Sequence, residues 1–164
     1  MFEPVRKLQA SDNVDRFDCG HSALNHFLQR YALQGQKAGS SQTYVSIAQG
    51  RVAGFYSLVV GSVSPANAPG RISKGLARHP VPVMILARLA VDVEHQRQGL
   101  GRALLKDALL RTLQAADIAG IRAVLVHAKD AQARPWYASW DFEPSVTDPY
   151  HLFLLLKDLK SALD

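Results

Sequence analysis

The sequence predicts a mixed α/β fold with one central sheet flanked by helices. Some segments are short, apolar and rich in β-branched residues, as strands are, whereas others repeat apolar residues at three- and four-residue spacing, as helices do. A strand–helix–strand unit occupies the middle of the chain. The length of 164 residues suits one domain with a sizeable core. We therefore expect a single domain over residues 1–164.

The N-terminal part predicts a short strand over residues 5–8 and a helix over residues 22–37. Apolar side chains recur on one face of that helix. They are Leu24, Phe27, Leu28 and Tyr31. Ser22 is the expected N-cap, because its hydroxyl can accept a hydrogen bond from the first turn. Gly39 ends the helical pattern.

A hairpin and a basic loop are expected next. Two β-rich runs, 42–48 and 52–63, flank Gln49-Gly50-Arg51, where the glycine permits a tight turn. Residues 64–80 contain three prolines, two glycines and no acidic residue, so we expect a loop rather than a regular element. Its cations are Arg71, Lys74 and Arg78.

The remaining elements follow from apolar runs and their spacing. Residues 81–93 form a long apolar run that predicts a central strand. A helix is expected over 99–117, a buried strand over 121–128 and a short helix over 131–139. Residues 151–159 begin as a strand, and the tail that follows has helical character.

The bulk composition bounds the class of protein. The net charge of +5 and the pI of about 9.6 suit a polyanionic partner but do not choose one. Cys19 is the single cysteine, which fits a reducing compartment and a packed side chain better than a catalytic thiol. The sequence has neither an apolar signal segment nor an apolar run long enough for a membrane helix. We expect a cytoplasmic protein.

Residues 96–101, Gln-Arg-Gln-Gly-Leu-Gly, lie between a predicted strand and a predicted helix. Leu104 stands where the dinucleotide fingerprint needs its third glycine, and the Lys-Ser/Thr of a P-loop is absent. The start of a helix nevertheless attracts anions, and two glycines let a phosphate approach the backbone. Arg97 and Arg102 add positive charge. The alternative is a turn that glycine merely eases.

The segment ARLAVDVEHQRQGLGRALLKDAL resembles motif A of the GNAT superfamily, the Gcn5-related N-acetyltransferases. Gln96, Gly99 and Gly101 match its signature, [QR]-x-x-G-x-[GA]. The resemblance implies a GNAT fold, with a sheet splayed at an acetyl-CoA cleft. It also implies pyrophosphate on the backbone amides of residues 97–102, and a pantetheine arm paired with the strand at 89–91. The cofactor-binding residues expected from it are Leu89, Ala90, Val91, Gln96, Arg97, Gln98, Gly99, Leu100, Gly101 and Arg102.

Nearly the whole chain resembles one subgroup, the TacT-like toxin acetyltransferases of toxin–antitoxin pairs. The resemblance rests on FDCGHSALNHFLQRYA, QTYVSIAQGRVAGFYSL, HPVPVMILARLAVD, VHAKDAQARPWYASWDF and PYHLFLLLKDL. It implies acetylation of the α-amine of aminoacyl-tRNA, which stops translation. It further implies a ribbon-helix-helix antitoxin and a homodimer.

Tyr137 is the expected general acid for the leaving thiolate, because it falls where the family has A-x-x-[FY]-Y. The alternative is an ordinary half-buried aromatic residue. Three departures from the family pattern surround it. Asp141 replaces a usual glycine, Trp136 replaces a smaller aromatic, and Pro135 requires a helix that starts just before it.

Other charged residues have open roles. Arg88 interrupts an apolar strand, so we expect either an ion pair with Asp92 or another acid, or a contact with the substrate, a phosphate or the ester carbonyl. The adjacent ester acidifies the α-amine of an aminoacyl ester, so acetyl transfer without a dedicated base is one alternative. Proton movement through water by Glu94, His95, His127 or Lys129 remains an alternative to simple surface or packing roles. The six histidines lack metal-site spacing, so no metal is expected.

Basic side chains are the candidates for tRNA phosphates. They are Arg30, Lys37, Arg71, Lys74, Arg78, Lys157 and Lys160. A solvated basic loop without a ligand is the alternative for residues 71–78. Two other functions stay open. One is acetylation of a small amine or a protein N-terminus, and the other is a non-catalytic acyl-CoA-binding or partner-binding module.

Overall fold

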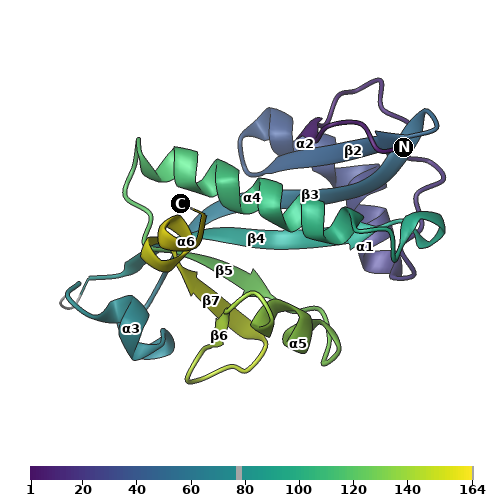
Figure 1. Ribbon diagram of the computed structural model, residues 1–164. Coiled ribbons are helices and arrows are strands. Elements are labelled where there is room, and N and C mark those ends of the chain that lie inside the picture. The colour runs from purple at the N-terminus through teal and green to yellow at the C-terminus, as the bar shows by residue number, and fades with distance from the viewer. Residues whose placement is uncertain (77–78, 164) are drawn as a thin grey trace. The chain divides into compact units, whose positions relative to one another are not determined.

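The computed structural model describes residues 1–76 and 79–163 (Figure 1). Seven strands form one mixed sheet in the order β1-β2-β3-β4-β5-β7-β6. The strands are β1 (Arg6–Lys7), β2 (Gln42–Ala48), β3 (Arg51–Val63), β4 (Val81–Val91), β5 (Ala123–His127), β6 (Glu143–Pro144) and β7 (His151–Leu155). β4 and β5 are parallel, whereas β1–β2, β2–β3, β5–β7 and β6–β7 are antiparallel. The predicted mixed α/β class is confirmed.

Helices connect these strands. They are α1 (Ser22–His26), a π-helical turn (Phe27–Tyr31), α2 (Ala32–Ala38), α3 (Gly70–Ser73), α4 (Leu100–Ala116), α5 (Ala133–Ala138) and α6 (Leu156–Leu163). Short 3₁₀ turns lie at Pro65–Asn67 and Val93–His95. None of the helices that the structure describes has the length and apolar character needed to cross a bilayer.

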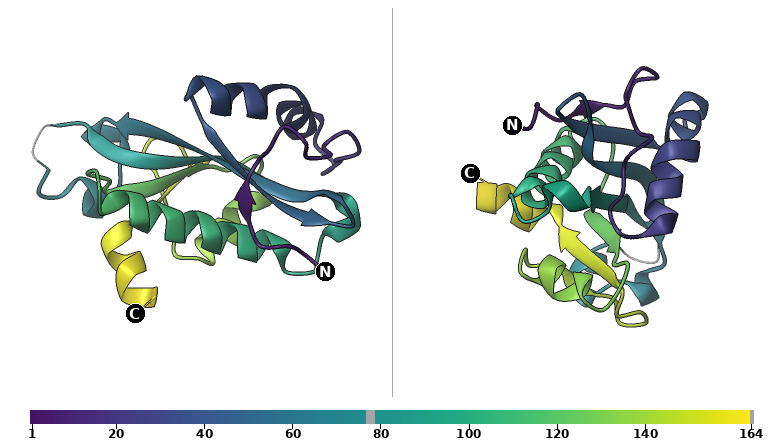
Figure 2. Two further views of the ribbon diagram at one scale, coloured as in Figure 1. Left: turned by 90° about the horizontal axis from the view of Figure 1, so that it is seen from above. Right: turned by 90° about the vertical axis from the view of Figure 1, so that its right-hand side faces the viewer.

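The chain divides into two compact units. The first contains Met1–Val59 and Ala87–Ala108. Its helices α1 and α2 lie on one face of β2 and β3, and the first half of α4 lies on the other (Figure 2). Leu28, Ala32, Val45 and Phe55 share the core beneath α1 and α2. Successive strand residues face opposite sides, so Gly54 and Tyr56 face α4.

The second unit contains Val60–Leu86 and Leu109–Asp164. Its core joins α3 to strands β4, β5 and β7. The core residues are Ala68, Ile72, Val81, Val83, Ala123, Leu125, Phe153 and Leu155. The β4–β5 ladder pairs Val83–Leu86 with Ala123–Val126. The division into two compact units does not test whether residues 1–164 form a single domain, which stays a prediction.

Most predicted elements are confirmed, and the differences have physical causes. Ser22 is the first residue of α1 and is not its cap; His21 is the N-cap and forms no side-chain cap bond. Gly39 does end α2, with a left-handed φ of 76°. The prediction that 64–80 is only a loop is wrong in part. Pro65 and Pro69 lie at the starts of short helices, where proline's missing N–H is harmless.

Candidate active site

Residues 96–99, which we call the glycine loop, have a backbone conformation that lets an anion approach closely. Arg97 and Gly99 both take left-handed φ values, 64° and 86°. Residues 96–99 are exposed. A Cβ placed on Gly99 would meet no atom within 4 Å, so the space beside this residue is open. The loop therefore fits the pyrophosphate that the sequence predicts, with room where a side chain would otherwise stand.

Helix α4 begins at Leu100, directly after this loop. Its first backbone hydrogen bond runs from the N–H of Ala103 to the carbonyl of Gly99 at 3.1 Å. N–H groups earlier in a helix have no partner four residues back, and they lie at the positive end of the helix dipole. Gly101 is the second residue of α4, so it falls in this first turn.

Leu100 contributes to this site through its backbone, because its side chain is buried. The Leu100 and Leu104 side chains pack over Gly54 of β3. A Cβ on Gly54 would lie 2.9 Å from a methyl carbon of each leucine. Gly54 therefore lets α4 lie close to the sheet and sets where the loop begins. The sequence analysis missed this residue, although a glycine inside a strand is a known sign of close approach.

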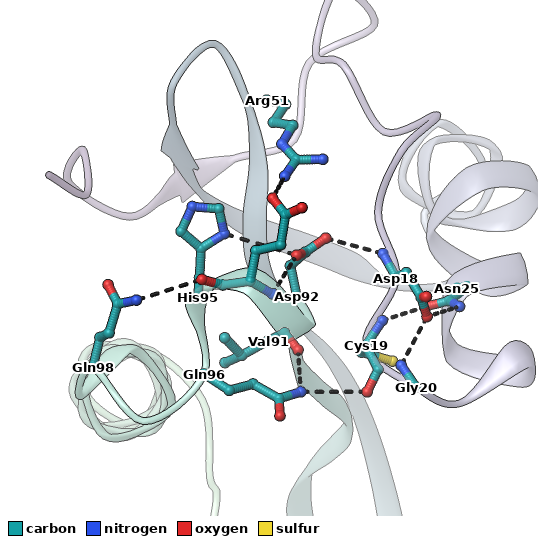
Figure 3. A network of polar contacts seen from close by, with 11 residues as sticks. Asp18, Cys19, Gly20, Asn25, Arg51, Val91, Asp92, His95, Gln96 and Gln98 are labelled. Carbon is teal, nitrogen blue, oxygen red and sulfur yellow. Dashed lines mark hydrogen bonds and ion pairs between the residues drawn. The ribbon is translucent and has the colours of Figure 1, made fainter.

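Gln96, predicted to bind the cofactor, holds the loop to its surroundings (Figure 3). Its Nε2 donates to the carbonyl of Val91 at 2.9 Å and to the carbonyl of Cys19 at 3.4 Å. These bonds join the end of β4 to the segment before α1. Gln98 similarly donates to the carbonyl of Glu94 at 3.4 Å. Both side chains position the loop backbone.

Asp92 is the buried centre of the same network (Figure 3). Its carboxylate accepts hydrogen bonds from the N–H of Asp18 at 3.0 Å and from the N–H of Glu94 at 2.9 Å. The Nδ1 of His95, itself buried, lies 3.8 Å from the same carboxylate. Glu94 also pairs with Arg51. The turn between β4 and the glycine loop is thus fixed by polar contacts that the sequence reasoning did not find.

Asp92→Ala is expected to destabilise the protein by about 1–3 kcal/mol, because two backbone N–H groups lose their partner. Acetyl-CoA affinity should fall as the turn before the glycine loop loosens. Urea unfolding and calorimetric titration measure the two effects. Asp117→Ala, at an exposed position after α4, is the control. Equal stability of the two variants would show that Asp92 does not hold the turn.

The predicted pantetheine-pairing residues lie at the carboxyl end of β4. Ala90 is buried, and Leu89 and Val91 are partly buried. The parallel ladder with β5 ends at Leu86, and β4 continues to Val91. Residues 89–91 lie beyond the last β4 residue that pairs with β5. A strand edge can pair with a ligand only where it is not already paired with the neighbouring strand. Their contact with pantetheine remains a prediction.

Tyr137 lies in α5 of the second unit and is buried. Its ring packs edge-on against Trp136 and Phe142, with centroids 5.0 Å and 5.6 Å away. Burial raises the pKa of the phenol well above its ordinary value of about 10. The phenol therefore stays protonated at neutral pH and can donate a proton. The rough pKa match with a thiolate expected from the sequence is weakened by this shift.

Pro135 is the third residue of α5, which starts at Ala133, so the expectation of a helix that begins just before this proline is confirmed. Asp141 lies where the family resemblance expects glycine, and its φ is 69°. Aspartate tolerates this left-handed conformation better than most residues do. The departure in sequence therefore keeps the backbone shape after α5.

Asp141→Gly should be more stable than Asp141→Ala by about 1 kcal/mol. The left-handed backbone costs alanine about 1–2 kcal/mol, and the greater freedom of unfolded glycine offsets part of this difference. Chemical denaturation of both variants measures the gap. A more stable alanine variant would contradict the left-handed conformation at this position.

Arg88 does not form an ion pair with Asp92, the acid named in the sequence analysis. The Asp92 carboxylate binds the two backbone N–H groups described above, and the Arg88 guanidinium carbon lies 3.7 Å from the centroid of the Phe27 ring. Partial burial lowers the pKa of Arg88, although arginine remains charged. The contact is a cation–π interaction that joins β4 to the π-helical turn. A contact between Arg88 and substrate remains a prediction.

The basic loop is only partly available for a polyanion. Arg71 binds Glu143 at 2.7 Å and also binds Asp158, so two carboxylates already balance its charge. These contacts raise the pKa of Arg71, and the hydrogen bond to Asp158 contributes most to the increase. Lys74 is exposed. Arg78 lies outside the described residues.

Arg122 explains how this loop is held, and the sequence analysis did not single it out. Its guanidinium donates to the carbonyls of Ile72 at 2.9 Å, Lys74 at 3.1 Å and Arg71 at 3.4 Å. Carbonyls at the end of a helix lack intrahelical donors, and Arg122 supplies them for α3. The loop is therefore tied to the start of β5.

The arrangement can bind an anion at one site and donate a proton at another. The glycine loop offers backbone N–H groups, open space and arginines, which suit the phosphates of acetyl-CoA. Tyr137 offers a protonated phenol. Among residues 1–76 and 79–163, no group of three or more His, Cys, Asp or Glu side chains is placed so that it could hold a metal ion.

Comparisons with known proteins agree with this geometry. The profile of the Acetyltransferase (GNAT) domain family matches residues 39–144. The chain is 46% identical over 162 residues to a tRNA-acetylating toxin of Mycobacterium tuberculosis (strain ATCC 25618 / H37Rv), covering 99% of this chain and 97% of the relative.

Solved structures show the same fold over the full length. One is AtaT in complex with acetyl-methionyl-tRNAfMet, with a TM-score of 0.91, 26% identity and coverage of 100% of both chains. Another is a tyrosine-to-phenylalanine mutant of AtaT bound to the C-terminus of the antitoxin AtaR and acetyl-CoA, with a TM-score of 0.84, 25% identity and coverage of 99% of this chain and 97% of that one. This chain belongs to the GNAT acetyltransferase family.

Proposed function

We propose that this protein is an acetyl-CoA-dependent N-acetyltransferase that acetylates the α-amine of aminoacyl-tRNA and thereby blocks translation. The observation that carries the proposal is the 46% identity, across nearly the full chain, to a tRNA-acetylating toxin. The solved AtaT structure that matches this chain throughout is bound to acetyl-methionyl-tRNAfMet. The basic net charge of +5 is consistent with a tRNA substrate.

The glycine loop has the role of holding the cofactor phosphates. We assign the pyrophosphate to the backbone N–H groups of residues 97–102, with Arg97 and Arg102 adding positive charge. Gln96 and Gln98 keep the loop in place through the bonds described above. The strand edge at 89–91 is assigned to the pantetheine arm. Acetyl-CoA supplies the acetyl group as a thioester.

Tyr137 is assigned the proton transfer. Its phenol oxygen donates a proton to the leaving sulfur, and its raised pKa keeps that proton in place until a base of sufficient strength forms. The AtaT mutant with phenylalanine in place of tyrosine that binds acetyl-CoA is consistent with a tyrosine that serves chemistry rather than cofactor binding.

The partners follow from the same family. We assign a ribbon-helix-helix antitoxin as the neutralising partner, because AtaT is found bound to the C-terminus of AtaR. We further propose a homodimer, and a cytoplasmic location where charged tRNA is available. Lys74 and the other exposed cations, rather than the doubly paired Arg71, are the first candidates for phosphate contacts.

The test is acetyl transfer from labelled acetyl-CoA to a pool of charged tRNA, with uncharged tRNA and free amino acids as controls. Label on charged tRNA alone is the expected result. Label on free amino acids would favour a small-amine acetyltransferase. Absence of transfer, with acetyl-CoA still bound in calorimetry, would favour a binding module.

A further inference from the structure

A pocket in the second unit lies outside the residues assigned so far. Its volume is about 530 Å³, within the range of small-molecule sites. Apolar side chains form part of its wall, namely Val63, Ile85, Leu125 and Phe153. Neutral polar residues, Ser62, Ser64, Asn67 and Thr147, line another part. Its titratable residues are His127, His151 and Asp148.

The two histidines are held together by the sheet. His127 ends β5 and lies opposite His151, the first residue of β7, in the antiparallel ladder. Their rings stack with centroids 4.2 Å apart and an interplanar angle of 20°. Positive charge on the neighbouring ring disfavours a proton on His127 at this separation.

Asp148 lies beside His151. One of its carboxylate oxygens lies 3.4 Å from Nε2 of His151. Its other oxygen accepts a hydrogen bond from the N–H of Tyr150 at 2.9 Å, which fixes the carboxylate in the loop. The carboxylate thus lies on the His151 side of the stacked rings.

His127 is exposed at the mouth of the pocket, and its surroundings still favour the neutral imidazole. Desolvation lowers its pKa most, His151 lowers it further, and Asp148 opposes them. A neutral imidazole at pH 7 can accept a proton from an amine that arrives as an ammonium ion. An apolar wall beside a neutral base suits an amino acid, whose side chain is often apolar and whose α-amine must lose a proton.

We propose that this pocket receives the aminoacyl group of charged tRNA and that His127 accepts the proton of its α-ammonium group. The inference rests on the proposed function and adds a base and an amino-acid subsite to it. The side chain of the amino acid lies against the apolar wall. The α-ammonium group lies at the stacked histidines.

The groups already named account for every proton that moves in the reaction. An N–H bond of the ammonium breaks, its electron pair stays on nitrogen, and the proton passes to a ring nitrogen of His127 and then to solvent. The neutral amine forms the N–C bond as the C–S bond breaks, and the phenol of Tyr137 protonates the sulfur. The second amine proton restores the phenol. The net products are the acetylated amine, the free thiol and one proton.

His127→Gln should lower kcat for charged tRNA by about 100-fold, within the usual contribution of general acid–base catalysis. Glutamine keeps a polar side chain but cannot take the proton. His21→Gln is the matched control, since His21 is exposed and forms no side-chain cap bond at α1. Calorimetry with acetyl-CoA shows whether each variant is folded.

His151→Gln gives a readout that a purely structural role would not give. Wild-type activity must fall at acid pH, as His127 becomes protonated. Removing His151 removes one cause of the lowered pKa of His127. The acid limb of the kcat profile should therefore move to higher pH. A limb set only by the substrate amine would stay where it is.

Histidine NMR of the wild-type protein with leucinamide, a stable mimic of an aminoacyl ester, tests the pocket without catalysis. The His127 and His151 signals should shift and the His21 signal should not. Wild-type activity on charged tRNA together with a His127→Gln rate equal to the His21→Gln rate would overturn the inference and leave the proposed function standing. An acid limb unmoved by His151→Gln, or no shift at His127 with leucinamide, would also overturn it. A wild-type enzyme inactive on charged tRNA would instead overturn the proposed function, and the inference with it.

Discussion

Tyr137→Phe lowers kcat for acetyl transfer by about 10²- to 10⁴-fold and leaves acetyl-CoA affinity unchanged. The first effect has the size expected when a general acid is removed. The second follows because phenylalanine keeps the ring that packs edge-on against Trp136 and Phe142. Steady-state kinetics with charged tRNA and calorimetry with acetyl-CoA measure the two quantities separately.

The control for this variant is Tyr31→Phe, because Tyr31 is 53% exposed and lies in the first unit. The wild-type pH profile provides a second check. Burial raises the pKa of Tyr137 above its ordinary value of about 10. The phenol therefore stays protonated as pH rises through the neutral and mildly alkaline range, and it should cause no loss of rate there. A kcat equal to wild type in Tyr137→Phe would mean that Tyr137 is not the acid.

Gly101→Glu is expected to abolish measurable acetyl-CoA binding. Gly101 is the second residue of α4, where backbone N–H groups and the helix dipole favour an anion. A glutamate there introduces bulk and a negative charge at the position assigned to the pyrophosphate. The helix itself should remain stable, because an acidic residue in a first turn is favourable.

Gln114→Glu makes the same change in charge near the other end of α4, at an exposed position. Calorimetric titration of both variants with acetyl-CoA separates a local effect from a change in net charge. Wild-type affinity in Gly101→Glu would refute the assignment of the phosphate site to this loop.

The sequence predicted the order of elements well, because apolar periodicity and glycine positions are local signals. Gly39 ends α2, and Gly50 lies in the hairpin turn with φ 77°. The π-helical turn at 27–31 was not predicted, since it shares the apolar spacing of an α-helix. The two-residue strand β6 was also missed, because its two residues are too few for any periodic pattern.

The site was predicted less completely, because several of its residues act through long-range contacts. Gln96 stands out in the sequence as part of a motif, but its bond to the Cys19 carbonyl joins residues far apart in the chain. Asp92 and Gly54 have no local pattern that reveals the backbone groups or leucines they meet. Arg71 was one of several candidates for a phosphate contact, with a solvated basic loop as the alternative. Its carboxylate partners, Glu143 and Asp158, lie far along the chain.

The most direct test of the proposed reaction identifies the molecule that receives the acetyl group. Charged tRNA is incubated with the enzyme and labelled acetyl-CoA, the ester is cleaved by mild alkali, and the released material is identified by mass spectrometry. The proposed function predicts that all label leaves the tRNA as N-acetyl amino acid. Label that stays on the RNA after the ester is cleaved, or that appears only on free amines, would contradict it.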